Sequence, residues 1–420
     1  MNIGMVALLV LVAVVLVGFI RKLNVGLLAI AAAVVLGYVS GQFSGKDIIS
    51  GFSASLFMTL LGVTLFFGII QENGCIENVM RRVIALFGKW IWMAPILLFT
   101  VAYIVAAIGP GCVPAMAFAA AMAIPMGHET GYNPIMLLII GNLGTYAGRF
   151  SPITPEGVLI KGILAEQGLN ISFPSLMLST LFGAVILFLV VFIGFKGFKL
   201  RSSNEKQGKT QIEKLNGRQI VALCSIAVMI LLVIIKTMDV GLASFLVSAF
   251  LLLTGVGDEK KAFARVPWNT LILVCGVGVL MKLVISAGGI EMLANTMSSV
   301  MSPWSAAGIT GVVAAVMSWF SSAIGVVFPT LLPTVGTIAE NVGGNVQSME
   351  LVSSIALFAS VAGLSPASTG GAIIMGACGA DDEFNRKYPS DKLFVQLLLW
   401  AFITVGVLAV MAFIGGFGWF

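Results

Sequence analysis

Two short polar motifs interrupt apolar segments at matching places in the two halves of the chain. The first, RFSPITPEG, spans 149–157, and the second, GLSPASTGG, spans 363–371, so they lie 214 positions apart. Proline, glycine and hydroxyl residues within a segment of membrane-spanning length break a helix. A bilayer tolerates the freed backbone groups only where they line a protected cavity, so the two motifs together predict a binding site.

Arg149 has the most specific chemistry in these motifs. An arginine at membrane depth is costly unless it is paired or hydrated, and its planar guanidinium suits a carboxylate. We therefore expect Arg149 to contact an anionic ligand. The alternatives are an ion pair with Glu156, hydrogen bonds to backbone carbonyls, or a side chain that extends to the cytoplasmic face. Gly363 occupies the equivalent position in the second motif, which predicts an asymmetric site.

Helix starts beside the motifs also favour an anion. Thr154-Pro155-Glu156 is typical of an N-cap followed by a first-turn proline and acid, and helix N-termini attract negative charge. The hydroxyls of the motifs contact the ligand in one interpretation and satisfy the broken backbone in the other. The residues predicted to bind substrate are Arg149, Ser151, Thr154, Gly109, Gly111, Ser322, Ser365, Ser368 and Thr369.

A coupling cation is expected to use the same region. Unwound backbone offers carbonyl oxygens to a cation such as sodium. The predicted ion-binding residues are Gly109, Pro110, Gly148, Ser321, Ser322, Ala323 and Gly363. Apart from sodium, no cofactor is expected, because a single histidine and five cysteines without paired spacing predict no zinc cluster.

Composition defines the solvent in which these residues must be positioned. The chain is 59% hydrophobic and 10% charged, with a mean hydropathy of +1.07, and many stretches near 20 residues long lack charges. We therefore predict an all-α polytopic membrane protein. The net charge is +5, and the basic residues lie in predicted loops, where the preference of lysine and arginine for the cytoplasmic side of a membrane explains them. No nucleic-acid partner is therefore expected. No predicted helix places catalytic groups together at membrane depth, which argues against an enzyme.

The repeat extends beyond the two motifs, since 56–77 aligns with 270–291 at the same offset of 214. It predicts two inverted repeats, each with about five transmembrane helices and one re-entrant hairpin. The predicted division is a first repeat at 1–194, with a hairpin at about 88–127 and a broken helix at about 133–168; a linker at 195–218; and a second repeat at 219–420, with a hairpin at about 303–342 and a broken helix at about 350–378.

The basic residues of the linker orient this topology. Cytoplasmic loops carry an excess of lysine and arginine, so the linker is placed in the cytoplasm and both termini outside. Counting each hairpin as re-entrant sorts the basic loops to one side, whereas counting each arm as a crossing does not. Amphipathic surface helices are expected at 77–87 and at about 290–301.

These features resemble the ion-transporter superfamily, which includes the divalent anion–sodium symporters and the large membrane subunits of TRAP transporters. The N-terminal half is most similar to malonate-carrier-like permeases. The resemblance rests on the opening MNIGMVALLV, the stretch SASLFMTLLGVTLFFGI, the segment RRVIALFGK, the hairpin AIGPGCVPAMA and the break GRFSPITPEG. It implies a scaffold domain, a transport domain that moves like an elevator, a homodimer in a prokaryotic cytoplasmic membrane, and di- or tricarboxylate substrates.

One departure from the family concerns sodium. The symporters typically carry Ser-Asn-Thr at both hairpin tips, whereas this chain has Gly109–Gly111 and Ser321–Ala323. Side-chain ligation of sodium is therefore reduced, and proton coupling stays open. The resulting prediction is a secondary active transporter of C3–C4 dicarboxylates such as malonate, malate or succinate. The alternatives are a transporter of another anion, a cation/proton antiporter, a TRAP-type membrane subunit and a passive channel.

Overall fold

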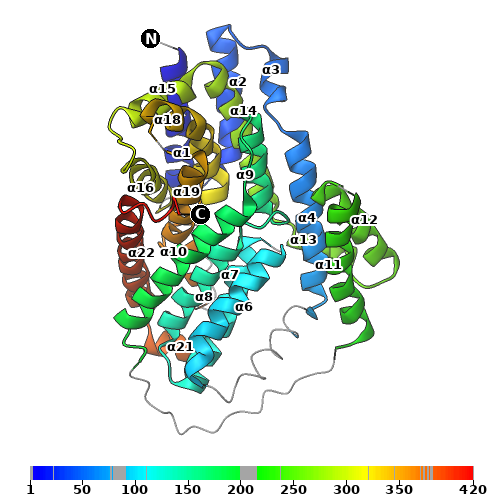
Figure 1. Cartoon of the computed structure of the whole chain (residues 1–420). Coiled ribbons are helices and arrows are strands. Elements are labelled where there is room, and N and C mark those ends of the chain that lie inside the picture. The colour runs from blue at the N-terminus through cyan, green and yellow to red at the C-terminus, as the bar shows by residue number, and fades with distance from the viewer. Residues whose placement is uncertain are drawn as a thin grey trace.

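The structure is a computed structural model that describes residues 3–21, 23–75, 78, 91–109, 111–198, 215–236, 238–319, 321–344, 346–368, 370–371, 374–375, 378 and 382–419. Within these ranges every regular element is a helix (Figure 1). The predicted all-α class is therefore confirmed. The predicted surface helix at 77–87 and most of the linker at 195–218 lie outside the described residues.

The first half of the chain forms a series of separate helices. In chain order they are α1 (Ile3–Arg21), α2 (Val25–Ser40), α3 (Gly45–Ser50), α4 (Ala54–Glu72), the 3-10 helix η1 (Ile91–Met93), α6 (Ala94–Ile108), α7 (Cys112–Thr130), α8 (Pro134–Gly148), α9 (Pro155–Glu166) and α10 (Phe173–Gly194).

The second half follows a similar order. Its described elements are α11 (Gly217–Lys236), α12 (Val240–Leu253), α13 (Glu259–Arg265), α14 (Trp268–Ser286), α15 (Gly289–Ser298), α16 (Ala306–Trp319), the π-helical turn η2 (Ala323–Val327), α17 (Phe328–Leu331), the 3-10 turn η3 (Leu332–Thr334), α18 (Val335–Val342), α19 (Ser348–Ala362), α21 (Asp382–Lys387) and α22 (Ser390–Phe413).

Several of these helices are suited to a bilayer. Large apolar side chains on the outer faces of the helices are exposed, for example Val39 on α2, Leu253 on α12 and Val410 on α22, and exposed apolar surface on this scale marks contact with lipid or protein. The segments long and apolar enough to cross a membrane are Gly45–Glu72, Phe173–Gly194, Trp268–Ser286, Ala323–Val342 and Ser390–Phe413.

The two halves pack against each other through equivalent glycines. α2 crosses α14 where Gly26 meets Gly276, and α4 crosses α12 where Gly62 meets Gly241; at each of these glycines an added Cβ would overlap backbone atoms of the other helix. Both α2 and α12 have an N-cap side chain that accepts hydrogen bonds from the backbone N–H groups of the second and third helical residues. These N-caps are Asn24 and Asp239. We refer to α1, α2, α4, α11, α12 and α14 as the first helix group.

A second helix group contains the predicted hairpins and broken helices. α8 packs against α6, α7 and α10, while α16 packs against α19 and α22, and α8 also contacts α19. In Figure 1, α6, α7 and α8 stand apart from α4, α11 and α12, which line the opposite side of the molecule. The cavity described below is lined by residues of both groups.

Both predicted hairpins consist of two helical arms joined at a short tip. Gly109 and Gly111 of the first tip lie between α6 and α7, and Ser321 and Ser322 of the second tip lie between α16 and the π-helical turn η2. The second arm of the second hairpin starts with a π-helical turn at Ala323, capped by the Ser322 hydroxyl. Non-helical segments also separate α8 from α9 and follow α19, at the two motifs. The re-entrant depth of the hairpins and the inverted repeat stay predictions.

Candidate functional site

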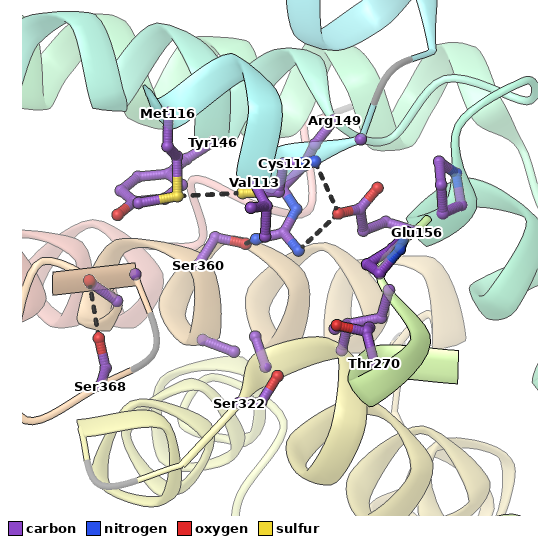
Figure 2. Close-up of a pocket in the computed structure, with 18 of the residues that line it drawn as sticks. Cys112, Val113, Met116, Tyr146, Arg149, Glu156, Thr270, Ser322, Ser360 and Ser368 are labelled. Atoms are coloured by element: carbon purple, nitrogen blue, oxygen red, sulfur yellow. Dashed lines mark hydrogen bonds and ion pairs between the residues drawn. The ribbon is translucent and has the colours of Figure 1, made fainter. Parts of the chain in front are cut away.

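A cavity lies where the two hairpin tips meet the two helix breaks, and the first helix group closes it with α4 and α14. It encloses about 840 Å³ of space not filled by atoms, including solvent at its mouth. Figure 2 shows its polar side chains converging from different elements. The lining residues include Thr64, Gly111, Cys112, Met116, Tyr146, Arg149, Glu156, Thr270, Ser318, Ser321, Ser322, Ala323, Ser360, Gly363 and Ser368.

Arg149 lies in the first break, directly after α8, and only 5% of it is exposed. Its Nη2 donates to Glu156 Oε1 at 2.9 Å, and its Nη1 donates to Ser360 Oγ at 3.3 Å. Its Nε has no hydrogen-bond partner in the part of the chain that the structure describes. The ion pair with Glu156, the first alternative to ligand contact, is therefore present, and the same arginine still lines the cavity.

Glu156 links this arginine to the first hairpin. It lies in the first turn of α9 and is 3% exposed. Its Oε1 accepts a second hydrogen bond, at 3.1 Å, from the backbone N–H of Cys112, the first residue of α7. Its Oε2 has no partner. An arginine and a helix N-terminus thus converge on one carboxylate oxygen, which is the arrangement expected for an anion site.

One hydroxyl group in each motif makes the same set of hydrogen bonds to the backbone of the helix break. The Thr154 hydroxyl lies 2.6 Å from the carbonyl oxygen of Arg149 and 2.7 Å from that of Ser151, and accepts from Gly157 N–H at 3.1 Å. The Ser368 hydroxyl lies 2.8 Å from the carbonyl oxygens of both Gly363 and Ser365. It accepts from Gly371 N–H at 3.1 Å. The predicted N-cap at Thr154 is confirmed.

A second pair of hydroxyls ties each break to its hairpin. Ser151 Oγ donates to the carbonyl of Ala107 at 2.6 Å, near the end of α6. Ser365 Oγ donates to the carbonyl of Trp319 at 3.2 Å, at the end of α16. These contacts satisfy backbone carbonyls that the ends of the helices leave free. Each break and its hairpin tip therefore form one hydrogen-bonded unit.

Comparisons with known proteins identify the class. Residues 1–149 match the family model described as "Dicarboxylate carrier protein MatC N-terminus". The fold is similar to that of the YdaH transporter of Alcanivorax borkumensis, with a TM-score of 0.59 and 9% sequence identity over 89% of this chain and 88% of that one. No curated protein matches the chain.

The chain is a transport protein. The predicted resemblance to malonate-carrier-like transporters is confirmed by the match to its N-terminal region, and the prediction of a transporter rather than an enzyme is confirmed with it. The fold similarity extends over both halves. The transporter is accordingly a multi-pass membrane protein.

The cavity of the transporter brings together part of the predicted site. Ser151, Thr154 and Ser365 are not among its lining residues, and Gly148 packs against the backbone of Tyr103 on α6. Gly109 adopts a positive φ of 126° beside the Phe67 ring. Pro110 and Thr369 lie outside the described residues. The predicted residues that line the cavity are Gly111, Arg149, Ser321, Ser322, Ala323, Gly363 and Ser368.

Sequence reasoning missed several polar residues of the transporter's cavity, among them Tyr146 and Ser360. Tyr146 and Ser360 each lie one helical turn before a break motif, three positions before Arg149 and Gly363 respectively. Residues three apart share a helix face, so this spacing could have indicated both. The Tyr146 hydroxyl has no hydrogen-bond partner although the residue is only 1% exposed. Among the described residues no cluster of His, Cys, Asp and Glu could hold a metal ion.

Proposed function

We propose that this transporter is a secondary active carrier of small organic anions, with C3–C4 dicarboxylates of the malonate, malate and succinate class as substrates. The observation that carries the proposal is the position of Arg149. It is a buried guanidinium on the wall of a cavity, with its Nε lacking a partner. The description of the matching family, a dicarboxylate carrier, supports this substrate class.

The two carboxylates of a substrate would use different parts of the cavity. The first binds Arg149 beside the N-terminus of α7, where positive charge is concentrated. The second reaches the hydroxyl of Ser322 on the opposite side (Figure 2), because the Ser368 hydroxyl already donates to carbonyls of its own break. Ser322 comes from the second half, so substrate bridges the two halves. Ser151, Thr154 and Ser365 support this site by holding the breaks.

Coupling and movement complete the proposal. A sodium ion binds carbonyl oxygens at the hairpin tips, near Gly109, Ser321 and Ala323, and adds the positive charge that a dianion requires. The second helix group carries the cavity across the membrane against the first group in an elevator movement. The transporter works as a homodimer in the cell membrane, with the 195–218 linker in the cytoplasm and both termini outside.

Uptake into proteoliposomes tests the proposal. The purified protein is reconstituted, and labelled malonate, malate and succinate are supplied with an inward sodium gradient, an inward proton gradient or no gradient. We expect saturable accumulation of at least one dicarboxylate that depends on one gradient. Flux without saturation would indicate a channel. Absence of uptake of all three by folded protein would contradict the substrate class.

A further inference from the structure

The carboxylate of Glu156 accepts hydrogen bonds from two donors at the wall of the cavity. Its Oε1 lies 2.9 Å from Arg149 Nη2 and 3.1 Å from the Cys112 backbone nitrogen. Figure 2 shows this carboxylate at the side of the cavity, between the arginine and the start of α7. A substrate carboxylate would seek the same guanidinium, so the two carboxylates compete for Arg149.

We propose that Glu156 is the internal counter-anion of the empty carrier. It neutralises Arg149 while no substrate is bound and yields the guanidinium to a substrate carboxylate during loading. This inference rests on the proposed function. Its physical basis is the high cost of moving a buried arginine without a partner through the membrane.

Charge counting supports this assignment. Arg149 and Glu156 are the only charged side chains among the described residues that line the cavity. Their charges cancel, so the empty site is neutral. With Glu156 replaced by glutamine, the empty site would carry an uncompensated positive charge. In the loaded state, a dicarboxylate dianion would balance the charge of Arg149 together with that of one coupled sodium ion.

The ion pair also leaves some of its own polar atoms without hydrogen bonds among the described residues, which suits a contact that has to open. Among the described residues, none is a hydrogen-bond partner of Arg149 Nε, Glu156 Oε2 or the Tyr146 hydroxyl. Buried polar groups in a purely structural network are normally satisfied. A substrate carboxylate that enters between Arg149 and Tyr146 would give partners to both. Glu156 would then retain the Cys112 N–H.

Two modes of transport separate this role from a structural one. Net uptake requires the empty carrier to return across the membrane in every cycle, whereas exchange of internal for external substrate uses only loaded movements. Loss of the counter-anion therefore slows net uptake selectively. A pair that merely holds the break against the first hairpin would affect both modes together.

The experiment compares Glu156→Gln with wild type in proteoliposomes, using the labelled dicarboxylate that wild type transports. Exchange is measured in vesicles loaded with unlabelled substrate, and net uptake is measured in vesicles without it. We expect the ratio of net uptake to exchange to fall by about tenfold or more, because empty return carries the unpaired charge. Glu166→Gln, an exposed carboxylate on the same helix, is the matched control and keeps the wild-type ratio.

Parallel losses of net uptake and exchange in Glu156→Gln, or an unchanged ratio, would overturn the inference. If that variant does not fold, Glu156→Asp provides the test, because it keeps the charge but shortens its reach. Its net uptake is then expected to fall by more than its exchange, and equal losses would overturn the inference. Absence of both activities in wild type would instead refute the proposed function, so the two failures are distinguishable.

Discussion

Tyr146 and Ser360 occupy equivalent positions on α8 and α19, 214 residues apart, and both face the same cavity. Ser360 accepts a hydrogen bond from Arg149, whereas the Tyr146 hydroxyl has no partner. One turn further along, Arg149 corresponds to Gly363. The two halves therefore use one backbone pattern to present different side chains, so the two ends of a bound ligand would meet different groups.

Arg149 and Glu156 are expected to show strong coupling in stability. Replacing Arg149 with alanine leaves the Glu156 carboxylate buried and unpaired, and breaking a buried pair in this way costs about 3–5 kcal/mol. The double variant Arg149→Ala/Glu156→Gln should recover much of that loss because neither charge remains. Unfolding in detergent, followed for both single variants and the double variant, measures the coupling.

Transport by the same variants separates stability from binding. Arg149→Ala and the double variant should both lose uptake, because each lacks the guanidinium that binds the substrate carboxylate. Arg218→Ala, an exposed arginine at the start of α11, should retain uptake. Substantial uptake by the more stable double variant would remove Arg149 from the substrate site.

Tyr146→Phe removes a buried hydroxyl that has no partner in the empty cavity. The stability of the empty protein should therefore stay the same or rise slightly, since no hydrogen bond is lost. If the hydroxyl binds substrate, affinity should fall by roughly 3–10-fold, the equivalent of one ordinary hydrogen bond. Thermal unfolding without substrate measures the stability of the empty protein. The thermal shift on adding substrate and the KM for uptake measure the change in affinity.

A matched tyrosine provides the control for this substitution. The Tyr132 hydroxyl donates to the carbonyl of Trp92 at 3.4 Å, outside the cavity. Tyr132→Phe should leave KM unchanged. A drop in the stability of Tyr146→Phe with no change in KM would contradict a role in binding.

The sequence predicted the breaks because proline, glycine and hydroxyls are rare enough in apolar segments to be conspicuous. The N-cap at Thr154 followed from local chemistry, and the structure has it. Tyr146 and Ser360 were missed because an aromatic residue or a serine within an apolar helix usually has only a packing role. The Glu156 contact to Cys112 N–H depends on how α9 meets the first hairpin, 44 residues away in the chain, and local patterns do not encode that placement.

The hydroxyls of Thr154 and Ser368 are predicted to contribute chiefly to stability. Each caps a break through three contacts with backbone groups. Thr154→Val and Ser368→Ala should each destabilise the protein by about 1–2 kcal/mol, the usual cost of losing such a cap. Thermal unfolding measures this. Because Ser368 also lines the cavity, its substitution should raise KM, whereas Thr154→Val should leave KM within about threefold of wild type.

The glycine crossing of α2 and α14 yields a prediction about the first helix group. A methyl group at Gly26 would overlap the Ile272 carbonyl and the Leu273 backbone, so Gly26→Ala must push the two helices apart. Overpacking of this kind typically costs about 1–3 kcal/mol, and small residues at such crossings allow close helix packing in membranes. Gly406→Ala on α22 is the matched control, because an added Cβ there meets no atom within 4 Å. Thermal unfolding in detergent should show a lower midpoint for Gly26→Ala alone, and equal midpoints for the two variants would contradict the crossing geometry.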